Sequence, residues 1–460
     1  MNDTKKADAL VLFGATGDLA HHKIFPAVQA LIERGLDLPI IGIAKGGMNK
    51  DAVVERIADG LTRYGDSDDS NARNKLFDNL RYIDGDYRDA GTFAQLKQAL
   101  RDCKHPLYYL AIPPSLFETV ILALKTVGLS DGARVVVEKP FGRDLESARQ
   151  LNSVLRGAFE ESSIFRIDHY LGKESVQNLL YFRFANSFLE AVWNRDHISS
   201  VSVTMAESFG VEGRGQFYEE VGAVRDVIQN HLLQVVSHLA MESPVGDGVD
   251  ALRDEKIRVL RSIRTVTGRS LVRGQYGGYR EERGVASASN VETYAAMELH
   301  LDSWRWADVP FYIRAGKSLA STATEAFVQF KRPPRQVFAE PSVDGSNYIR
   351  FRLGPDRVAI GIGARAKKHG TELIGEDVEL YVCNGAEDEM GAYERLIGDA
   401  IAGDTTLFTR EDAVLEAWRI VDPLTRLATP LHSYEVGSWG PREADKLERH
   451  GHKWRAPAAG

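Results

Sequence analysis

The first third of the chain alternates short apolar runs with helical patterns, and this alternation limits the possible folds more than any other feature. Four apolar runs end in turn residues: Ala9–Phe13, Ile40–Ala44, Leu107–Ile112 and Arg134–Val137. After the first run, apolar residues recur at helical spacing until Gly35, at Ile24, Val28, Leu31 and Ile32. Because strands that alternate with crossover helices run parallel, this region predicts a doubly wound parallel sheet.

The pattern changes in the remainder of the chain. Polar and apolar residues alternate, wholly or in part, in five segments: Ile198–Met205, Ala295–Leu301, Ala326–Phe330, Tyr348–Leu353 and Val378–Val382. Alternation with period two is typical of strands that expose one face, and long helical segments separate these strands. A chain of 460 residues is also longer than the length that a single hydrophobic core usually supports. We therefore predict an α/β Rossmann-type N-terminal domain at residues 1–172, and a larger α+β C-terminal domain with a mostly antiparallel sheet at residues 173–460.

Net charge and cysteine usage exclude several classes of function. The formal net charge of −8 provides no basic field, so we expect no nucleic-acid partner and no binding to an anionic membrane. Cys103 and Cys383 lie far apart without a CxxC motif or a Cys/His cluster, which favours a reducing compartment and argues against structural zinc. The sequence shows no signal peptide and no apolar stretch long enough to span a bilayer, so we expect a cytoplasmic protein.

A glycine-containing turn follows the first predicted strand. Residues Gly14–Ala20 read Gly-Ala-Thr-Gly-Asp-Leu-Ala and lead into a helix. The two glycines let the backbone approach a pyrophosphate, and the helix N-terminus faces it with a partial positive charge. An ordinary strand–helix turn has the same pattern. We interpret the turn as a dinucleotide site, with cofactor contacts at Gly14, Ala15, Thr16, Gly17, Asp18 and Leu19.

One short segment, Asp168–Glu174, concentrates ionisable side chains. On a helix, His169, Tyr170 and Lys173 would face one point and present two cationic groups to an anion such as a phosphate monoester. Asp168 would point elsewhere, where its carboxylate can orient a partner histidine. Each of these residues taken alone is more often a solvated or core-edge side chain.

His231 is the candidate general base, because imidazole titrates near neutral pH. It lies in a helical segment that begins at Gly222, and the apolar stripe of this helix consists of Ile228, Leu232, Val235 and Leu239. At the edge of that stripe an imidazole is held rigid and still reaches a cleft. The pattern alone also fits a structural core-edge histidine.

Together these motifs resemble the glucose-6-phosphate dehydrogenase family. Asp168–Glu174 matches the family's DHYLGKE sequence at every position, Gly14–Ala20 matches GxxGDLA, and Arg225–Gln234 matches RDxxQNHxxQ. Further matches extend over nearly the whole chain. The resemblance implies oxidation of glucose 6-phosphate at C1 to 6-phosphogluconolactone with hydride transfer to NADP, the first step of the oxidative pentose phosphate pathway. It also implies a homodimer or homotetramer, and it implies no metal.

The resemblance assigns roles to individual residues. It implies that His231 removes the proton from the C1 hydroxyl, while Asp168 holds the imidazole tautomer and stabilises the imidazolium. The implied substrate contacts are Lys139, His169, Tyr170, Lys173, Glu207, Asp226 and Lys317. Further implied coenzyme contacts are Lys23, Lys45, Pro113, Lys139 and Pro140.

Three features leave alternatives open. Glu138-Lys139-Pro140 also occurs in sugar-acting dehydrogenases of the glucose–fructose oxidoreductase and inositol dehydrogenase type, which lack the Asp168–Glu174 block. Lys45 stands where the family usually has arginine, so it keeps the charge that favours NADP but loses the bidentate geometry. We expect NADP as the preferred coenzyme, with NAD as an alternative. Thr322 stands where the family usually has a positively charged residue. This difference leaves another sugar phosphate as an alternative substrate. A non-catalytic nucleotide-binding paralogue is the remaining alternative.

Overall fold

The structure is a computed structural model in which the chain divides into two compact units. It describes residues 6–246, 248–335, 337–338, 347–354, 359–371, 373–383, 390–427, 429–448 and 453–457. The first unit comprises Met1–Lys173, Gly246–Arg253 and Glu389–Leu415, and the second comprises Glu174–Val245, Asp254–Asp388 and Glu416–Gly460.

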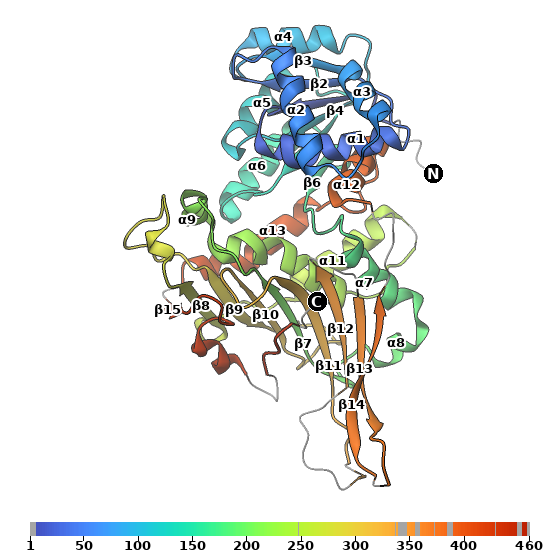
Figure 1. The fold of residues 1–460 in the computed structure, drawn as a ribbon, viewed down its shortest axis with the longest axis vertical. Coiled ribbons are helices and arrows are strands. Elements are labelled where there is room, and N and C mark those ends of the chain that lie inside the picture. The colour runs from blue at the N-terminus through green and yellow to red at the C-terminus, as the bar shows by residue number, and fades with distance from the viewer. Residues whose placement is uncertain are drawn as a thin grey trace. The chain divides into compact units, whose positions relative to one another are not determined.

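A six-stranded parallel sheet forms the centre of the first unit (Figure 1). Its strands are β1 (Ala9–Phe13), β2 (Ile40–Ala44), β3 (Leu80–Asp84), β4 (Pro106–Leu110), β5 (Arg134–Glu138) and β6 (Ile164–Ile167). They are arranged in the order β3-β2-β1-β4-β5-β6. Strands β1, β2, β4 and β5 are buried at every residue, as expected when helices cover both faces of a parallel sheet. The predicted doubly wound sheet is confirmed, and its strand order is that of dinucleotide-binding domains.

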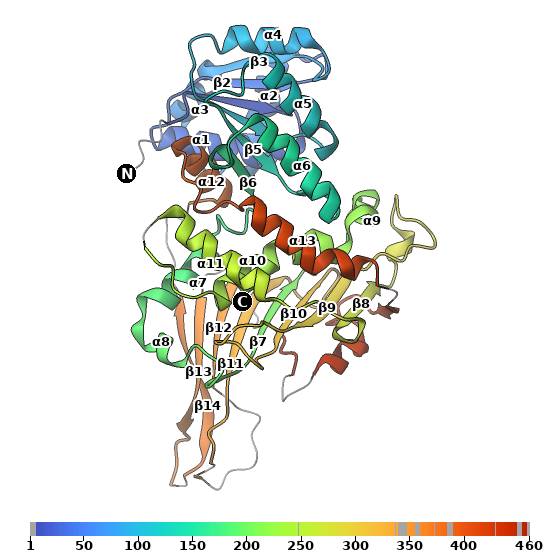
Figure 2. The ribbon, with the colours of Figure 1, turned by 180° about the vertical axis from the view of Figure 1, so that it is seen from behind.

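Helices pack on the two faces of this sheet. One group consists of η1 (Ala20–Ile24), α1 (Phe25–Glu33), α2 (Lys50–Tyr64) and α3 (Ser70–Asn79). The other consists of α4 (Ala90–Ala99), α5 (Phe117–Thr126) and α6 (Leu145–Ala158), of which α5 and α6 lie towards the viewer in Figure 2. Two short 3-10 helices, η2 (Pro114–Leu116) and η3 (Glu161–Ser163), precede α5 and β6.

One helix from the C-terminal part of the sequence belongs to the first unit. Helix α12 (Ala392–Ala402) packs against α1 and η1. Its buried residues Leu396 and Ile397 share a hydrophobic core with Leu10 and Phe165. The predicted boundary at residue 172 assigned this segment to the second domain. The pattern of α12 by itself identifies an apolar face but not the core that this face covers, so the placement of α12 in the first unit could not be predicted from it.

A nine-stranded sheet forms the centre of the second unit, in the order β14-β13-β12-β11-β7-β10-β9-β8-β15. Its strands are β7 (Ile198–Ala206), β8 (Leu271–Tyr276), β9 (Tyr294–Leu299), β10 (Phe311–Gly316), β11 (Ala323–Phe330), β12 (Tyr348–Gly354), β13 (Ala359–Lys367), β14 (Gly375–Cys383) and β15 (Leu431–Tyr434). Only the β7–β10 and β8–β15 pairs among these described strands are parallel. The prediction of a mostly antiparallel sheet is confirmed.

The helices of the second unit include a π-helical segment. The elements that lie wholly in this unit are α7 (Glu174–Ala185), α8 (Ser187–Val192), α9 (Gly215–Ala223), η4 (Val224–Leu232), α10 (Leu233–Ala240), η5 (Gly268–Ser270), η6 (Tyr279–Glu281) and η7 (Arg442–Leu447). Helices α11 (Val249–Ser262) and α13 (Glu411–Thr425) contain residues of both units. In the part of the chain that the structure describes, no helix combines the length and apolar character needed to cross a membrane.

Candidate active site

The glycine turn lies at the carboxyl end of β1 in the first unit. The Gly14 amide donates to the Ile43 carbonyl at 2.8 Å, and Gly14 has a φ of +86°. A Cβ at Gly14 would lie 2.1 Å from the Ala111 carbonyl oxygen, so only glycine fits between the ends of β2 and β4. Gly17 is exposed, and η1 and α1 follow the turn. This exposed backbone, at the point where the strand order reverses between β1 and β4, fits the pyrophosphate of a nicotinamide dinucleotide.

Two side chains from distant parts of the first unit hold this turn. Arg56, on α2, donates to the Thr16 carbonyl at 2.8 Å and to the Asp18 carboxylate at 3.1 Å. The Tyr87 hydroxyl accepts from the Gly14 amide at 2.9 Å and donates to the Ile43 carbonyl at 3.1 Å. Sequence analysis missed Arg56 and Tyr87, because neither carries a motif and only the packing of α2 and the loop after β3 brings them to the turn.

Two carboxylates surround the end of β2. The Lys45 ammonium donates to the Asp86 carboxylate at 2.8 Å. Asp84, the last residue of β3, accepts from the backbone amides of Gly46 and Gly47 at 3.0 and 3.2 Å. Strand β2 itself ends without an acid, but the neighbouring strand β3 and the loop that follows it supply one each. Lys45 is therefore paired rather than freely available to a 2′-phosphate.

The remaining predicted coenzyme residues of the first unit lie at or near the carboxyl ends of strands, or one turn into the first helix. Lys23 is exposed on η1, and Pro113 is exposed just beyond β4. Lys139 and Pro140 are partly buried immediately after β5, and the peptide bond between them is cis. These positions border the edge of a parallel sheet at which ligands bind.

The segment after β6 is a tight turn rather than the predicted helix. Amides of Leu171, Gly172 and Lys173 each donate to the carbonyl three residues earlier, at 3.0, 3.2 and 3.1 Å, and α7 begins only at Glu174. The Asp168 carboxylate accepts from the Tyr170 amide at 3.0 Å. A side chain that binds its own backbone in this way competes with helix formation, which explains why the helical prediction was wrong.

The turn nevertheless brings the predicted phosphate-binding side chains together. The Lys173 ammonium lies 3.9 Å from the centre of the Tyr170 ring, and the rings of His169 and Tyr170 are 5.3 Å apart. The His169 ring also stacks on Tyr393 of α12, with centroids 6.2 Å apart and an interplanar angle of 12°. Burial lowers the pKa of Lys173, opposed by the charge of Asp168. Tyr393 lies in no motif that carries recognisable chemistry, so this stacking could not be predicted from the sequence.

In the second unit, the ends of β7 and β10 place two predicted substrate residues side by side. The Lys317 ammonium donates to the Glu207 carboxylate at 2.6 Å. Lys317 is 2% exposed and lies 5.2 and 5.4 Å from the ring centres of Phe209 and Tyr218. The Thr322 hydroxyl, at the position of the usual cation, accepts from the Ser208 amide at 3.0 Å. The arrangement offers a single buried ammonium in an aromatic setting.

His231 lies on η4 in the same unit. The predicted α-helix is a π-helix over Val224–Leu232 and becomes an α-helix only in α10. The apolar stripe is confirmed, because Ile228, Leu232, Val235 and Leu239 are each fully buried. His231 itself is only 2% exposed, so it lies within packed structure rather than at its edge. Single π-turns often occur at functional sites.

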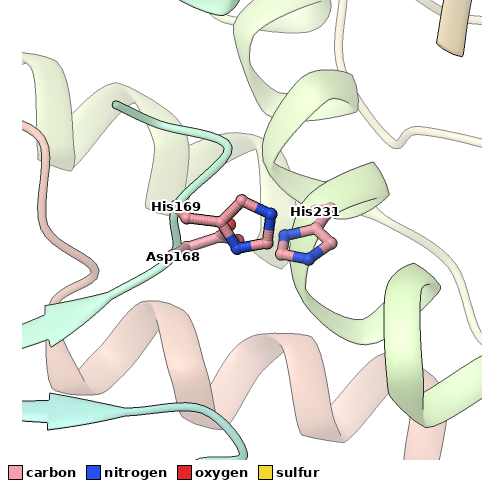
Figure 3. A group of neighbouring side chains, drawn as sticks. All are labelled: Asp168, His169 and His231. Carbon is pink, nitrogen blue, oxygen red and sulfur yellow. The ribbon is translucent and has the colours of Figure 1, made fainter. Parts of the chain in front are cut away.

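Asparagine side chains and backbone fix the helix around His231. The His231 amide donates to the Asn230 side chain at 2.6 Å, and that side chain donates to the carbonyl of Asp226 at 2.9 Å. Asp226 lies in the first turn of η4 and is partly buried. Figure 3 shows His231 on this helix, and Asp168 and His169 on the segment that follows β6. Asp168 belongs to the first unit and His231 to the second.

The fold and these residues together define a class of protein. A six-stranded parallel sheet in dinucleotide order, with an exposed glycine turn at its reversal point, is typical of nicotinamide-dependent oxidoreductases.

The chain belongs to the glucose-6-phosphate dehydrogenase family. Residues 11–178 match the family model described as "Glucose-6-phosphate dehydrogenase, NAD binding domain", and residues 180–455 match the model of the C-terminal domain. The chain is 42% identical to glucose-6-phosphate 1-dehydrogenase 1 of Mycobacterium bovis, over 98% of this chain and 97% of the relative. It is 39% identical to glucose-6-phosphate 1-dehydrogenase of Aggregatibacter actinomycetemcomitans, over 98% and 97%.

Solved structures agree with this assignment. The structure of glucose-6-phosphate 1-dehydrogenase from Mycobacterium avium matches with a TM-score of 0.92 and 43% identity, over 99% of both chains. A glucose-6-phosphate dehydrogenase in complex with its substrate glucose 6-phosphate matches with a TM-score of 0.91 and 34% identity, over 98% of this chain and 99% of that one. The family predicted from the motifs is thereby confirmed.

Proposed function

We propose that the protein oxidises glucose 6-phosphate at C1 to 6-phosphogluconolactone with transfer of hydride to NADP, the first step of the oxidative pentose phosphate pathway. The observation that carries this proposal is the end-to-end match to this family, including a relative solved with glucose 6-phosphate. The chain keeps each ionisable residue that the chemistry needs, among them Asp168, Lys173 and His231.

In the proposed reaction, His231 removes the proton from the C1 hydroxyl as the C1–H bond breaks, so that a C1=O bond forms. The nicotinamide, when bound, accepts the hydride. Asp168 has the proposed role of fixing the His231 tautomer and stabilising the imidazolium. The burial of His231 supports this role, because a rigid imidazole in a low-dielectric setting interacts strongly with a carboxylate.

Substrate binding is proposed to use the residues that the sequence motifs identified. His169, Tyr170 and Lys173 present a compact polar group that suits a phosphate monoester. Lys139 follows β5, at the sheet edge where the coenzyme and the substrate meet. The sugar hydroxyls would be bound by the remaining residues of the predicted set: Glu207, Asp226 and Lys317.

Coenzyme binding is proposed to use the turn Gly14–Leu19 with Lys23, Lys45, Pro113, Lys139 and Pro140. Lys45 supplies charge for the 2′-phosphate of NADP, and its pairing with Asp86 weakens that contribution. We therefore infer that NADP is the preferred coenzyme and that NAD is also accepted.

The test of this function is an assay of the purified protein with glucose 6-phosphate and either coenzyme, followed by the absorbance of the reduced coenzyme. Turnover is expected with both coenzymes. At low coenzyme concentration it should be faster with NADP than with NAD. No turnover with either coenzyme, despite nucleotide binding, would support the non-catalytic alternative. His231→Asn serves as the matched inactive control.

A second candidate is an oxidoreductase for another sugar phosphate. The specific observation that favours it is Thr322, which bonds to Ser208 where the family usually places a cation. A panel of sugar phosphates at matched concentration distinguishes the two. A higher kcat/KM for a sugar other than glucose 6-phosphate would favour the second candidate.

We also propose a cytoplasmic homodimer or homotetramer. Strand β14 lies at one end of the nine-stranded sheet and exposes the apolar side chains of Leu380, Tyr381 and Val382, which are 64%, 49% and 61% exposed. An exposed apolar edge strand of this kind is usually covered by another chain. Light scattering coupled to size exclusion is expected to give two or four times the mass of the chain.

A further inference from the structure

A buried carboxyl group lies directly behind the proposed substrate-binding residues of the first unit. Glu138 is the last residue of β5, immediately before Lys139, and is only 8% exposed. The Tyr109 hydroxyl donates to its carboxylate at 2.6 Å. Tyr109 is paired with Val136 on the neighbouring strand, so it lies on the same face of the sheet as Glu138, two residues further along. The two side chains therefore meet at the carboxyl ends of adjacent strands.

A second tyrosine joins this carboxyl group to the turn after β6. The hydroxyl of Tyr393, from α12, interacts with the Glu138 carboxyl and lowers its pKa. The ring of the same tyrosine stacks on the imidazole of His169, with centroids 6.2 Å apart. A Cβ at Gly172 would lie 2.6 Å from the Ala392 carbonyl oxygen, so the backbone of α12 also contacts this turn closely. One side chain of α12 thus stacks on His169 and interacts with Glu138.

Charged and titratable groups face Glu138 from each element packed against it. They are Tyr109 from β4, Lys139 from its own strand end, Asp168 from the segment after β6, and Tyr393 from α12. Burial raises the pKa of Glu138 to about 7, opposed by the hydroxyls of Tyr109 and Tyr393 and by Lys139, and reinforced by Asp168. A buried acid is costly to desolvate, and polar networks around such a group fix the geometry of their neighbours.

We propose that Tyr109, Glu138 and Tyr393 form a positioning network that fixes Lys139 and His169 in the arrangement that binds the phosphorylated substrate. This inference rests on the proposed function and names three further residues that serve it. Glu138 acts through Lys139, its neighbour in the chain. Tyr393 acts through His169, on which its ring stacks. They are positioning residues rather than catalytic ones.

The first test compares three tyrosine variants in steady-state kinetics. Tyr109→Phe removes the hydroxyl that donates to Glu138, and Tyr393→Phe removes the second hydroxyl that interacts with it. Tyr393→Leu removes that hydroxyl and the stacked ring. We expect KM for glucose 6-phosphate to rise about 3- to 10-fold in each phenylalanine variant and further in Tyr393→Leu, with little change in kcat. KM for the coenzyme should change less than about twofold. A raised KM for glucose 6-phosphate with an unchanged kcat, and a smaller effect in Tyr393→Phe than in Tyr393→Leu, distinguish a positioning role from a merely structural one.

The matched control is Tyr108→Phe. Tyr108 is the strand neighbour of Tyr109, is fully buried, and donates to the Leu129 carbonyl at 2.8 Å on the opposite face of the sheet. The Tyr108→Phe variant also loses one hydroxyl hydrogen bond but should leave KM for glucose 6-phosphate unchanged. If the Tyr109 and Tyr393 variants behave like Tyr108→Phe, the positioning network does not exist.

A second measurement keeps the proposal falsifiable when a variant has low activity. In the full-length protein, the ring resonances of His169, assigned with His169→Gln, should shift in Tyr393→Leu and in Tyr109→Phe but not in Tyr108→Phe. Unshifted resonances in both variants would overturn the network even if kinetics changed. Failure of the parent protein to oxidise glucose 6-phosphate is a separate result, which overturns the proposed function and with it the substrate role of the network.

Discussion

At the residue scale, Lys45 and Asp86 set how much positive charge the end of β2 offers to a coenzyme. The Lys45 ammonium lies 2.8 Å from the Asp86 carboxylate, and this hydrogen bond is the largest cause that lowers the pKa of Asp86. Asp84 adds a second carboxylate at the Gly46 and Gly47 amides. A 2′-phosphate must compete with Asp86 for one lysine, whereas a 2′-hydroxyl does not.

Coenzyme selectivity should therefore respond to Asp86. We expect Asp86→Asn to raise the ratio of kcat/KM for NADP to that for NAD by about 3- to 10-fold, because it releases Lys45 and removes one negative charge. Lys45→Ala should lower the same ratio. Initial rates at saturating glucose 6-phosphate with varied coenzyme measure both effects, and the NAD values are the internal control. Equal ratios in the parent and both variants would contradict this account.

Glu138 makes stability depend on pH in a defined direction. Its pKa in the folded protein is raised from 4.5 to about 7, so the fold favours the protonated form. The resulting contribution to the free energy of unfolding is fully present below about pH 4.5 and is lost as the pH rises through about 7. Between about pH 5 and about pH 8, the free energy of unfolding of Glu138→Gln should rise relative to that of the parent by on the order of 1 to 3 kcal/mol. Urea unfolding across this range tests it, with the exposed Glu118→Gln as control. Parallel curves for Glu138→Gln and the parent would show that Glu138 keeps an ordinary pKa.

At the element scale, four of the six strands of the first unit could be predicted, whereas the turn after β6 could not. Each of the four predicted apolar runs overlaps an observed strand, because a buried parallel strand is a continuous apolar run. The segment after β6 was predicted as a helix, but the Asp168 carboxylate binds the Tyr170 amide and makes a turn. Likewise, nothing local distinguishes the π-helix η4 from an α-helix.

The turn after β6 makes a specific demand on Gly172. A Cβ at this position would lie 2.6 Å from the Ala392 carbonyl and 2.9 Å from the Leu396 side chain. Gly172→Ala should therefore destabilise the protein by about 1 to 3 kcal/mol and raise KM for glucose 6-phosphate. Gly157→Ala is the matched control, because it lies in α6 with nothing within 4 Å of an added Cβ. The Gly157→Ala substitution should stabilise the protein slightly. Urea unfolding of both variants measures the difference, and equal effects would refute the close approach.

At the scale of the whole molecule, the candidate site is assembled from residues far apart in the sequence. Motifs located the residues that carry recognisable chemistry, such as His231 and Lys317. They gave no sign of Arg56, Tyr87 or Tyr393, whose roles come from packing. The side chains of these three residues are ordinary in their own segments. Only the arrangement of helices around the sheets gives them a function, and a single sequence does not encode that arrangement in local patterns.

The largest spatial inference concerns Asp168 of the first unit and His231 of the second. If they act as a pair, His231→Asn should lower kcat by roughly a thousandfold or more while leaving binding of glucose 6-phosphate largely intact. Asp168→Asn should cause a smaller loss, because the imidazole remains but its tautomer is no longer fixed. His197→Asn, an exposed histidine of the same unit, is the control for His231→Asn.

The double variant decides whether the two residues belong to one catalytic unit. A carboxylate that acts only through His231 has nothing to act on once the imidazole is gone. The double variant should therefore be about as slow as His231→Asn alone, so the two losses would not multiply. Measurement of kcat for the parent, both single variants and the double variant completes the cycle. Losses that multiply would mean that Asp168 serves the reaction independently of His231, and the general base would then need another partner.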